Sequence, residues 1–173
     1  NGGANWSPMT IAGGTGLRAI QFINSTEGFV TGDNGIVYKT TDGGITWTSI
    51  STSTNHSFLS VHFVDNVTGF VAGYNSKIYR TVNGGISWAA MDLPGSTTVN
   101  SVYFLNGTTG FAACGFGYLF KTTNGGLNWQ FGEAGTYWLN DIKFVNQQTG
   151  YVVSDIGIVY KTTNSGANWI EEP

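Results

Sequence analysis

The chain has 173 residues, of which only 10% are charged, and its net charge is −3 at pH 7. Its seven basic residues are spread along the sequence and form no basic cluster, so we expect no nucleic-acid partner. Apolar runs stay well short of the ~18 residues that cross a bilayer, so we expect no membrane insertion. The single cysteine, Cys114, excludes an internal disulfide, and its apolar neighbours predict a small buried side chain.

The sequence opens with a six-residue phrase that recurs at an almost fixed interval. The five tryptophans that end these phrases are separated by 41, 41, 41 and 40 residues. The phrases are Asn1-Gly-Gly-Ala-Asn-Trp6, Asp42-Gly-Gly-Ile-Thr-Trp47, Asn83-Gly-Gly-Ile-Ser-Trp88, Asn124-Gly-Gly-Leu-Asn-Trp129 and Asn164-Ser-Gly-Ala-Asn-Trp169. A period of about 41 residues indicates a propeller or another repeat array.

Between the phrases, each repeat contains the same short segments in the same register. In the first full repeat they are Ile20–Ile23, Gly28–Val30 and Val37–Thr40, and a fourth segment begins at Trp47. All are rich in β-branched and aromatic residues and are bounded by Gly, Asn, Asp or Ser, which is typical of strands. Four strands in about 40 residues make one blade of a β-propeller. We find no helical periodicity and expect almost no helix.

The sequence therefore predicts an all-β protein built from blades of four antiparallel strands. We predict one domain over residues 1–173, with an outer strand of a preceding blade at 1–10 and four blades at 17–50, 58–91, 99–132 and 138–172. This layout has one strand more than four closed blades need. It favours a partial or self-assembling propeller, or a chain with further blades, over a closed four-bladed ring.

The longer phrase Thr40-x-Asp42-x-Gly44-x-Thr46-Trp47 resembles the Asp-box, or bacterial neuraminidase repeat. Its Asp or Asn side chain is expected to accept backbone N–H bonds across a turn, and its Gly to adopt a conformation that a Cβ would strain. We therefore assign a structural role to the following residues: Asp42, Gly44, Trp47, Asn83, Gly85, Trp88, Asn124, Gly126, Trp129, Asn164, Gly166 and Trp169.

The whole repeat is also similar to one family. The pattern Gly-Phe-Val-x-Gly, followed by Tyr-Lys-Thr-Thr-Asp-Gly-Gly-x-x-Trp, resembles the photosystem II stability/assembly factor-like repeats. The resemblance covers essentially the whole chain. It implies a β-propeller and, because such repeats occur in secreted and surface proteins of bacteria, a secreted or cell-surface location. It implies no particular activity.

Enzymatic interpretations of these repeats are weak. Asn replaces Asp in four of the five phrases, and an amide cannot act as a general base. Sialidases resemble the chain in these boxes, but their sites use three arginines, whereas this sequence contains only Arg18 and Arg80. Asp141 and Asp155 form the one carboxylate pair that we consider for another glycosidase. We expect no catalytic residues, and a fragment of a carbohydrate-active hydrolase remains the alternative.

Other polar residues are interpreted as structural. His56 and His62 match no metal-ligand spacing, so we expect neither a metal nor another cofactor. One cation recurs at the same position of each blade, and its stem is expected to pack along the blade over an aromatic ring. These cations are Lys39, Arg80, Lys121 and Lys161.

Binding is expected where the repeats differ. One variable position on the first strand holds Gln21, His62, Tyr103 and Lys143, which we expect to line a common face. Trp138 is the only Trp outside the phrases, and it either binds a ligand or packs between blades. The candidate ligand-binding residues are Tyr137, Trp138, Asn140, Asp141, Asp155, Tyr74 and Phe116. We predict a non-enzymatic binding or scaffold module for a protein or glycan that also self-associates or joins further blades. An assembly-chaperone-like propeller is a further alternative.

Overall fold

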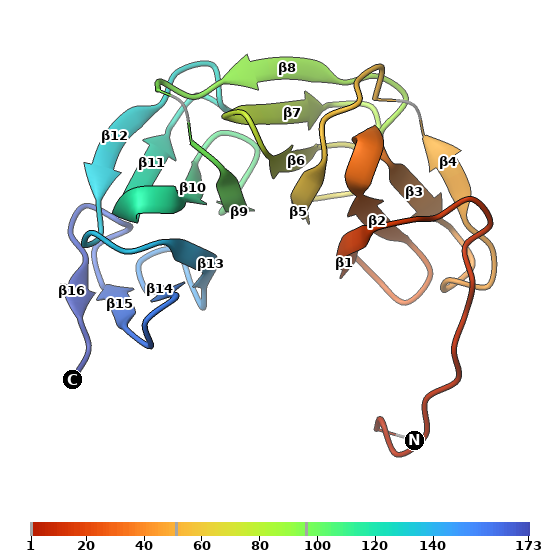
Figure 1. The fold of residues 1–173 in the computed structure, drawn as a ribbon, viewed down its shortest axis with the longest axis horizontal. Coiled ribbons are helices and arrows are strands. Elements are labelled where there is room, and N and C mark those ends of the chain that lie inside the picture. The colour runs from red at the N-terminus through yellow and green to blue at the C-terminus, as the bar shows by residue number, and fades with distance from the viewer. Residues whose placement is uncertain (1, 51, 96) are drawn as a thin grey trace.

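The computed structural model describes residues 2–50, 52–95 and 97–173. Its strands form four separate sheets of four strands, arranged side by side in an open arc (Figure 1). Within every sheet the strands follow one another in chain order and pair antiparallel. The expected all-β fold of four propeller blades is confirmed, and the blades do not close into a ring.

In each blade the first strand lies on the concave side of the arc and the fourth on its convex side (Figure 1). Blade 1 consists of β1 (Leu17–Phe22), β2 (Gly28–Gly32), β3 (Val37–Thr40) and β4 (Thr48–Ile50). Blade 2 consists of β5 (Phe58–Phe63), β6 (Gly69–Gly73), β7 (Lys77–Thr81) and β8 (Ala89–Asp92). Blade 3 consists of β9 (Val99–Phe104), β10 (Gly110–Cys114), β11 (Tyr118–Thr122) and β12 (Gln130–Glu133). Blade 4 consists of β13 (Leu139–Phe144), β14 (Gly150–Ser154), β15 (Val159–Thr162) and β16 (Ile170–Glu171).

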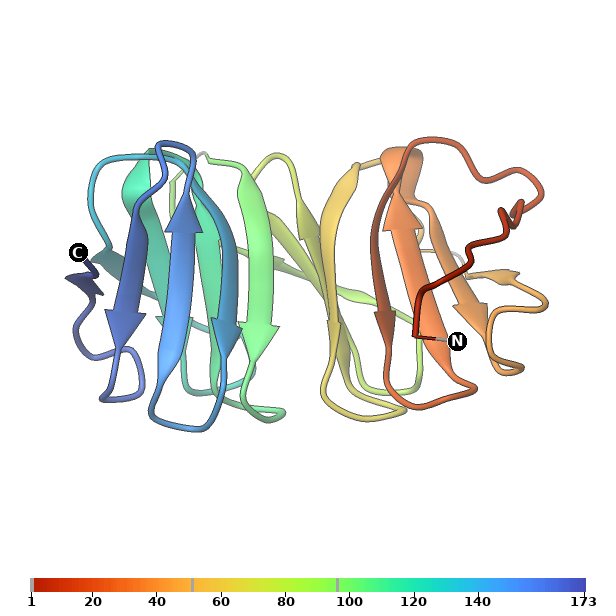
Figure 2. The same ribbon diagram turned by 90° about the horizontal axis from the view of Figure 1, so that it is seen from below.

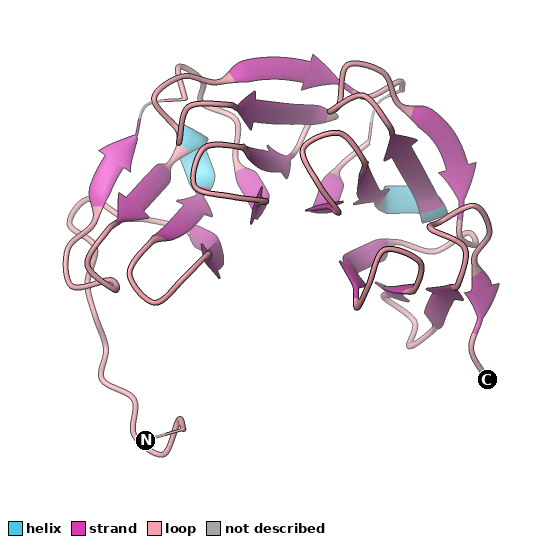
Figure 3. Ribbon diagram, turned by 180° about the vertical axis from the view of Figure 1, so that it is seen from behind, coloured by secondary structure: helices cyan, strands magenta, loops and turns pink. Residues whose placement is uncertain are grey.

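Helix is nearly absent from the described residues, as the sequence predicts. The short 3₁₀ turns η1 (Asp33–Gly35) and η2 (Gly115–Gly117) join the second and third strands of blades 1 and 3 (Figure 3). Seen from below, the blades stand in a row and their strands run between two edges of the arc (Figure 2). One edge holds η1, η2 and the equivalent turns of blades 2 and 4. We call it the rim edge.

The hydrophobic core lies between the blades. Three clusters of buried side chains each join two neighbouring blades. In every cluster a Phe of one blade stacks on a Phe of the next, with ring centroids 3.5 Å apart for Phe29 and Phe63 and 3.4 Å for Phe70 and Phe104. Since each blade can bury its flat face only against a neighbour, the blades stabilise one another as the units of a repeat array do.

The predicted outer strand at residues 1–10 is not formed. Residues 2–16 contain no strand, and the Trp6 side chain is 88% exposed. Asn1, which begins this phrase, lies outside the described residues. A strand requires a hydrogen-bonded neighbour. Each of the four blades in the described residues already has four strands, so none of them lacks an outer strand that this segment could supply.

Candidate functional site

The four phrases that begin at Asp42, Asn83, Asn124 and Asn164 form turns that are locked by their own side chains. Thr40 Oγ1 donates to Asp42 Oδ1 at 2.8 Å and accepts from the backbone N–H of Gly44 at 2.9 Å. The Asp42 carboxylate accepts from the hydroxyl of Thr46 at 2.6 Å and from its backbone N–H at 2.9 Å. These bonds lower the pKa of Asp42 to about 2, with the Thr46 hydroxyl as the largest cause. Gly44 has a φ of +90°, which a Cβ would strain.

The other three turns make the same bonds with Asn in place of Asp. In blade 2, Asn83 Oδ1 accepts from the Thr81 hydroxyl at 2.9 Å and from the backbone N–H of Ser87 at 2.9 Å. Blades 3 and 4 repeat both contacts through Asn124 and Asn164. We call residues 42–47, 83–88, 124–129 and 164–169 the box turns. The side-chain oxygen of the Asp or Asn accepts bonds from the turn itself in all four box turns, which is a structural role.

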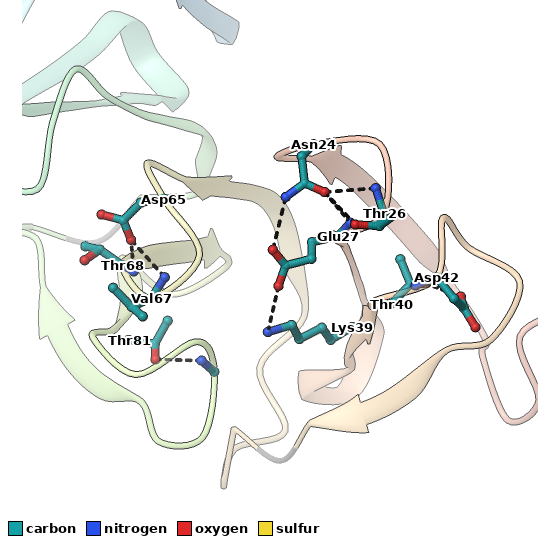
Figure 4. A network of polar contacts seen from close by, with 11 residues as sticks. Asn24, Thr26, Glu27, Lys39, Thr40, Asp42, Asp65, Val67, Thr68 and Thr81 are labelled. Carbon is teal, nitrogen blue, oxygen red and sulfur yellow. Dashed lines mark hydrogen bonds and ion pairs between the residues drawn. The ribbon is translucent and has the colours of Figure 1, made fainter.

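A second set of turns lies beside the box turns, on the edge opposite the rim edge. Asn24 Oδ1 accepts from the backbone N–H groups of Thr26 and Glu27, and the Asn24 amide donates to Glu27 at 3.1 Å (Figure 4). Glu27 lies 3.7 Å from Lys39. Asp65 caps the equivalent turn of blade 2 in the same way, as Figure 4 also shows. Asn24 and Asp65 therefore have a structural role, since their oxygens satisfy backbone N–H groups of the turns.

The recurring cations lie over aromatic rings, as expected. The four pairs are Lys39 over Phe29 at 5.4 Å, Arg80 over Phe70 at 5.9 Å, Lys121 over Phe111 at 5.5 Å and Lys161 over Tyr151 at 5.7 Å. The cation also reaches the next blade, because Lys121 Nζ donates to the carbonyl of Ser165 at 2.7 Å. In blade 3 the cation thus fastens the blade to the box turn of blade 4.

The variable inner-strand residues make contacts between blades. Gln21 Nε2, His62 Nε2 and Tyr103 OH each donate to a backbone carbonyl of the next blade. The acceptors are Phe63, Phe104 and Phe144, at 3.0, 2.9 and 3.2 Å. These hydrogen bonds give the three side chains a structural role between blades, and the expectation that they line a common binding face stays a prediction. Burial lowers the pKa of His62 to about 4, so this imidazole is neutral at pH 7.

Two further titratable candidates, His56 and Cys114, are engaged by the scaffold. His56 Nδ1 lies 2.8 Å from both the Thr54 hydroxyl and the Tyr79 hydroxyl. Across the described part of the chain, no three His, Cys, Asp or Glu side chains gather as a metal site would require. Cys114 is buried as expected, and burial raises the pKa of its thiol to about 12. A thiol with so high a pKa is a poor nucleophile.

Two of the predicted ligand-binding residues meet at the rim edge. Phe116 lies in η2 of blade 3, Trp138 directly precedes β13 of blade 4, and their ring centroids are 5.6 Å apart. Phe116 is 55% exposed and Trp138 is 40% exposed. Two aromatic residues that the sequence analysis did not select extend this pair through ring contacts, Tyr118 at 6.0 Å from Phe116 and Phe131 at 5.1 Å from Tyr118. We call these four side chains the aromatic rim.

Trp138 packs between blades, which is one of its two expected roles, and its role in ligand binding stays a prediction. Its indole lies against blade 3, because a Cβ placed on Gly115 would lie 3.3 Å from Trp138 Cε2. Its backbone carbonyl accepts from the N–H of Asp155 at 3.0 Å, a bond whose acceptor in the other blades is Gly16, Ser57 or Thr98. The indole therefore packs between two blades while two fifths of its side chain stay open to solvent.

The backbone at Phe116 is in the left-handed region. Its φ is +62°, and the equivalent residues of blades 1 and 2 are Asn34 at +57° and Asn75 at +63°. Asn adopts this conformation at little cost, whereas a bulky side chain there is uncommon. Blade 3 thus places an exposed ring at a position where the fold favours Asn.

Comparisons with known proteins agree with this geometry. The family model described as photosynthesis system II assembly factor YCF48 matches residues 45–172. The chain belongs to this family. A search of curated proteins gave no match.

Solved structures extend the likeness of this YCF48-family chain at the level of the fold. A structure described as YCF48 bound to D1 peptide aligns over 91% of this chain and 81% of its own, with 16% identity and a TM-score of 0.59. YCF48 from Cyanidioschyzon merolae aligns over 88% of this chain and 52% of its own, with 17% identity and a TM-score of 0.72. A GH74 enzyme from Niastella koreensis aligns over 90% of this chain and 30% of its own, with 20% identity and a TM-score of 0.74.

Asp141 and Asp155, the two carboxylates considered for glycoside hydrolysis, have different surroundings in this YCF48-family chain. Asp141 lies in β13, where it accepts from the hydroxyl of Ser101 at 2.6 Å and pairs with Lys143 at 3.1 Å. Asp155 is exposed in the turn after β14. Asp141 is thus engaged by neighbouring side chains, while Asp155 faces solvent beside the aromatic rim.

The other predicted ligand-binding residues are exposed but dispersed. Tyr137 and Asn140 flank the Trp138 segment of blade 4, and both are exposed. Tyr74 occupies the rim-edge turn of blade 2 and is also exposed, two blades away from Trp138. The sequence analysis missed the ion pair of Arg18 with Asp33, at 3.1 Å on the rim edge of blade 1. No helix in the described ranges combines the length and apolar character of a membrane span.

Proposed function

We propose that this YCF48-family chain is a non-enzymatic binding or scaffold module of a secreted or cell-surface bacterial protein. Its ligand is an extended protein segment, which lies on the aromatic rim of blades 3 and 4. The observation that carries the proposal is the exposed ring of Phe116, held in a left-handed backbone conformation beside Trp138.

The cost of this arrangement supports a binding role. A bulky residue in the left-handed region costs about 1 kcal/mol relative to Asn or Gly. Burial does not offset that cost, because more than half of the Phe116 side chain is in solvent. Strained and exposed aromatic residues are found where a surface is organised for a partner.

A protein segment fits the chemistry of the rim better than a small ligand does. The rim is an exposed line of rings rather than a closed pocket, and aromatic side chains are enriched at protein interfaces. The exposed Asn140 and Asp155 add polar groups that can accept and donate hydrogen bonds beside the rings. A relative with the same fold is described as bound to a D1 peptide, and an assembly role would require capture of such a segment.

The proposal is tested by panning a random peptide display library against the chain and measuring the affinity of the selected peptides for three variants. Phe116→Asn removes the ring and restores the residue of blades 1 and 2, and Trp138→Ala removes the second ring. Leu127→Ala, at an exposed box turn on the opposite edge, is the matched control. We expect the two rim variants to weaken binding at least about tenfold, which corresponds to about 1.4 kcal/mol, and the control to be unchanged. Equal affinity of all four proteins would exclude the rim.

Two parallel assays test the alternatives to peptide binding, which are a glycan ligand and a glycosidase activity. A glycan array distinguishes a sugar partner, since a flat ring and amides also suit sugars. Chromogenic glycosides, with Asp141→Asn as the control, test the hydrolase alternative. Turnover that is lost in Asp141→Asn would contradict the non-enzymatic proposal, and glycan binding that depends on Phe116 would replace the peptide by a sugar.

A further inference from the structure

The aromatic rim is bordered by a carboxylate that lacks the cation found at the same place in another blade. We infer that the protein segment bound on the rim carries a Lys or Arg side chain, whose charged group pairs with Glu133 and lies over the rings of Tyr118 and Phe131. This inference rests on the binding function proposed above and adds the chemical class of the ligand. All three residues belong to blade 3, which has a neighbouring blade on each side.

The equivalent place in blade 2 holds a complete ion pair. Lys77, the first residue of β7, lies opposite Asp92, the last residue of β8, and its ammonium contacts the Asp92 carboxylate. In blade 3 the same two positions hold Tyr118 and Glu133, which lie opposite each other on β11 and β12. Tyr118 directly follows η2, so both residues lie at the rim edge. Blade 3 therefore keeps the carboxylate and replaces the ammonium with an aromatic ring.

The described residues supply no other cation to Glu133. Its side chain is exposed, and no described residue forms an ion pair or a hydrogen bond with its carboxylate. All seven basic side chains of the sequence are engaged elsewhere, five of them in ion pairs with other carboxylates. The remaining two are Arg80, which lies over Phe70, and Lys121, which donates to the carbonyl of Ser165. The charge of Glu133 is thus open to a partner.

The rings beside Glu133 suit a cation. Residues directly opposite on antiparallel strands have Cβ atoms about 5 Å apart, so Glu133 and Tyr118 share one small area of surface. Phe131 precedes Glu133 by two residues, which places both on one face of the strand, and its ring meets the Tyr118 ring edge-on at 5.1 Å. An ammonium or guanidinium group is attracted to the face of an aromatic ring within about 6 Å. A cation at this place can therefore contact the rings and the carboxylate together.

Blade 4 shows a similar replacement beside the other end of the aromatic rim. In blade 1 the Arg18 guanidinium pairs with Asp33. Their repeat equivalents in blade 4 are Asn140 and Asp155, so this blade also keeps the carboxylate without the cation of its own pair. Asp155 donates its backbone N–H to the carbonyl of Trp138, which places this residue beside the rim. Blades 1 and 2 thus hold complete pairs, whereas the two blades that carry the rim hold carboxylates in place of pairs.

This distribution of charge favours a cationic segment over an acidic or an apolar one. Carboxylates beside the rings repel a segment that places Asp or Glu there, since like charges across an interface are unfavourable. An apolar segment would remove water from Glu133 and supply nothing in return, which costs free energy. A Lys or Arg side chain offers an apolar stem for the rings and a charged group for the carboxylate.

Peptides selected on the wild-type chain from a random display library test this inference. We expect Lys or Arg in these peptides more often than in the unselected library. Replacement of that residue by norleucine should weaken binding about fivefold, the combined effect of one exposed ion pair and one cation–π contact. The affinity of the original peptide should also fall as the ionic strength rises, because salt screens an exposed charge pair.

Two variants that each remove one negative charge separate Glu133 from a general effect of net charge. Glu133→Gln should weaken the cationic peptide at least about threefold and leave the norleucine peptide unchanged. The matched control is Asp65→Asn, which removes a charge on the opposite edge and gives this turn the capping Asn of the other three blades. It should bind both peptides as the wild type does. Glu133→Lys should bind a peptide with Glu in place of the cation more tightly than the wild type does.

The outcomes distinguish this inference from the proposed function. Selected peptides that require Phe116 and Trp138, yet lack Lys and Arg or bind Glu133→Gln as tightly as the wild type, would overturn the cationic ligand and leave the aromatic rim as the binding surface. An equal loss of affinity in Glu133→Gln and Asp65→Asn would overturn it as well. Peptides that bind Phe116→Asn and Trp138→Ala without loss, or a library that yields no binder, would overturn both proposals.

Discussion

Two regions of the molecule vary from blade to blade, one on the inner strands and one at the rim-edge turns. The inner-strand position holds Gln21, His62, Tyr103 and Lys143, and the turn position holds Asn34, Asn75, Phe116 and Ile156. On the inner strands, three different side chains make one and the same hydrogen bond to the next blade. At the turn, the change from Asn to Phe places a ring in solvent. Variation within a repeat can thus leave the contact unchanged, as on the inner strands, or replace it with an exposed side chain, as at the turn.

The largest expected effect concerns His62 and the pH dependence of stability. Its pKa is about 4 in the folded chain, below the ordinary value of 6.5, so the unfolded chain binds more protons between these values. Stability should be fully present above pH 6.5 and fall as the pH decreases toward 4, by up to about 3 kcal/mol. His62→Gln should keep the stability at pH 7, as Gln21 makes the same bond in blade 1, and flatten this slope. Urea unfolding at several pH values measures the slope, and an unchanged slope in His62→Gln would mean that His62 does not cause it.

Thr81 occupies a position that holds Thr in all four blades, and its effect on stability can be compared with that of a variable position at the rim edge. Thr81 is buried, and its hydroxyl accepts from the Gly85 N–H at 2.9 Å and donates to Asn83. Thr81→Val keeps the shape and leaves the Gly85 N–H without its acceptor, so we expect a loss of about 2 kcal/mol. Tyr74→Ala at the rim edge, a larger truncation of an exposed residue, should change stability by less than about 0.5 kcal/mol. If thermal unfolding ranks the two variants in the reverse order, the box turns are not the structural locks described above.

Phe116→Asn should change stability in the favourable direction. Asn is the residue of blades 1 and 2 at this left-handed position, so relief of the backbone strain should raise the free energy of unfolding by about 1 kcal/mol. Chemical denaturation measures the gain, and Tyr118→Asn in the same blade is the control without a positive φ. A loss of stability in Phe116→Asn would show that the ring is there for packing.

The smallest effect is expected at Asp42. Its pKa of about 2 lies below the ordinary value of 3.8, so the contribution of this carboxylate is present above the ordinary value and is lost as the pH falls toward 2. The other box turns carry Asn and lack this sensitivity. Asp42→Asn should therefore leave the midpoint at pH 7 nearly unchanged and lessen acid unfolding below pH 3.8. An acid profile that does not respond would mean that the Asp42 bonds add no stability.

The fold could be predicted from the sequence because the same apolar and turn residues recur in register. The segments before Trp47, Trp88, Trp129 and Trp169 are strands in all four blades, and the cations of the Lys39 series lie over the expected rings. The strand around Trp6 could not be excluded from sequence, since strand formation depends on a partner and not on composition.

The candidate site was less predictable than the fold. Phe116 and Trp138 were selected as deviations from the repeat, and the structure brings them together. The same criterion pointed to His62 and Tyr103, whose variation is structural. Periodicity shows which residues share a position, but it does not show whether a side chain points to solvent or to a neighbouring blade.

The most direct test of the aromatic rim as the binding surface uses the tryptophan side chains. The six indole N–H signals are followed by nuclear magnetic resonance while a library-selected peptide is added, and Trp138→Phe assigns the signal of Trp138. The account predicts that the peptide shifts the Trp138 signal and leaves those of Trp47, Trp88, Trp129 and Trp169 in place. A shift confined to the box-turn tryptophans, with the Trp138 signal unmoved, would contradict it.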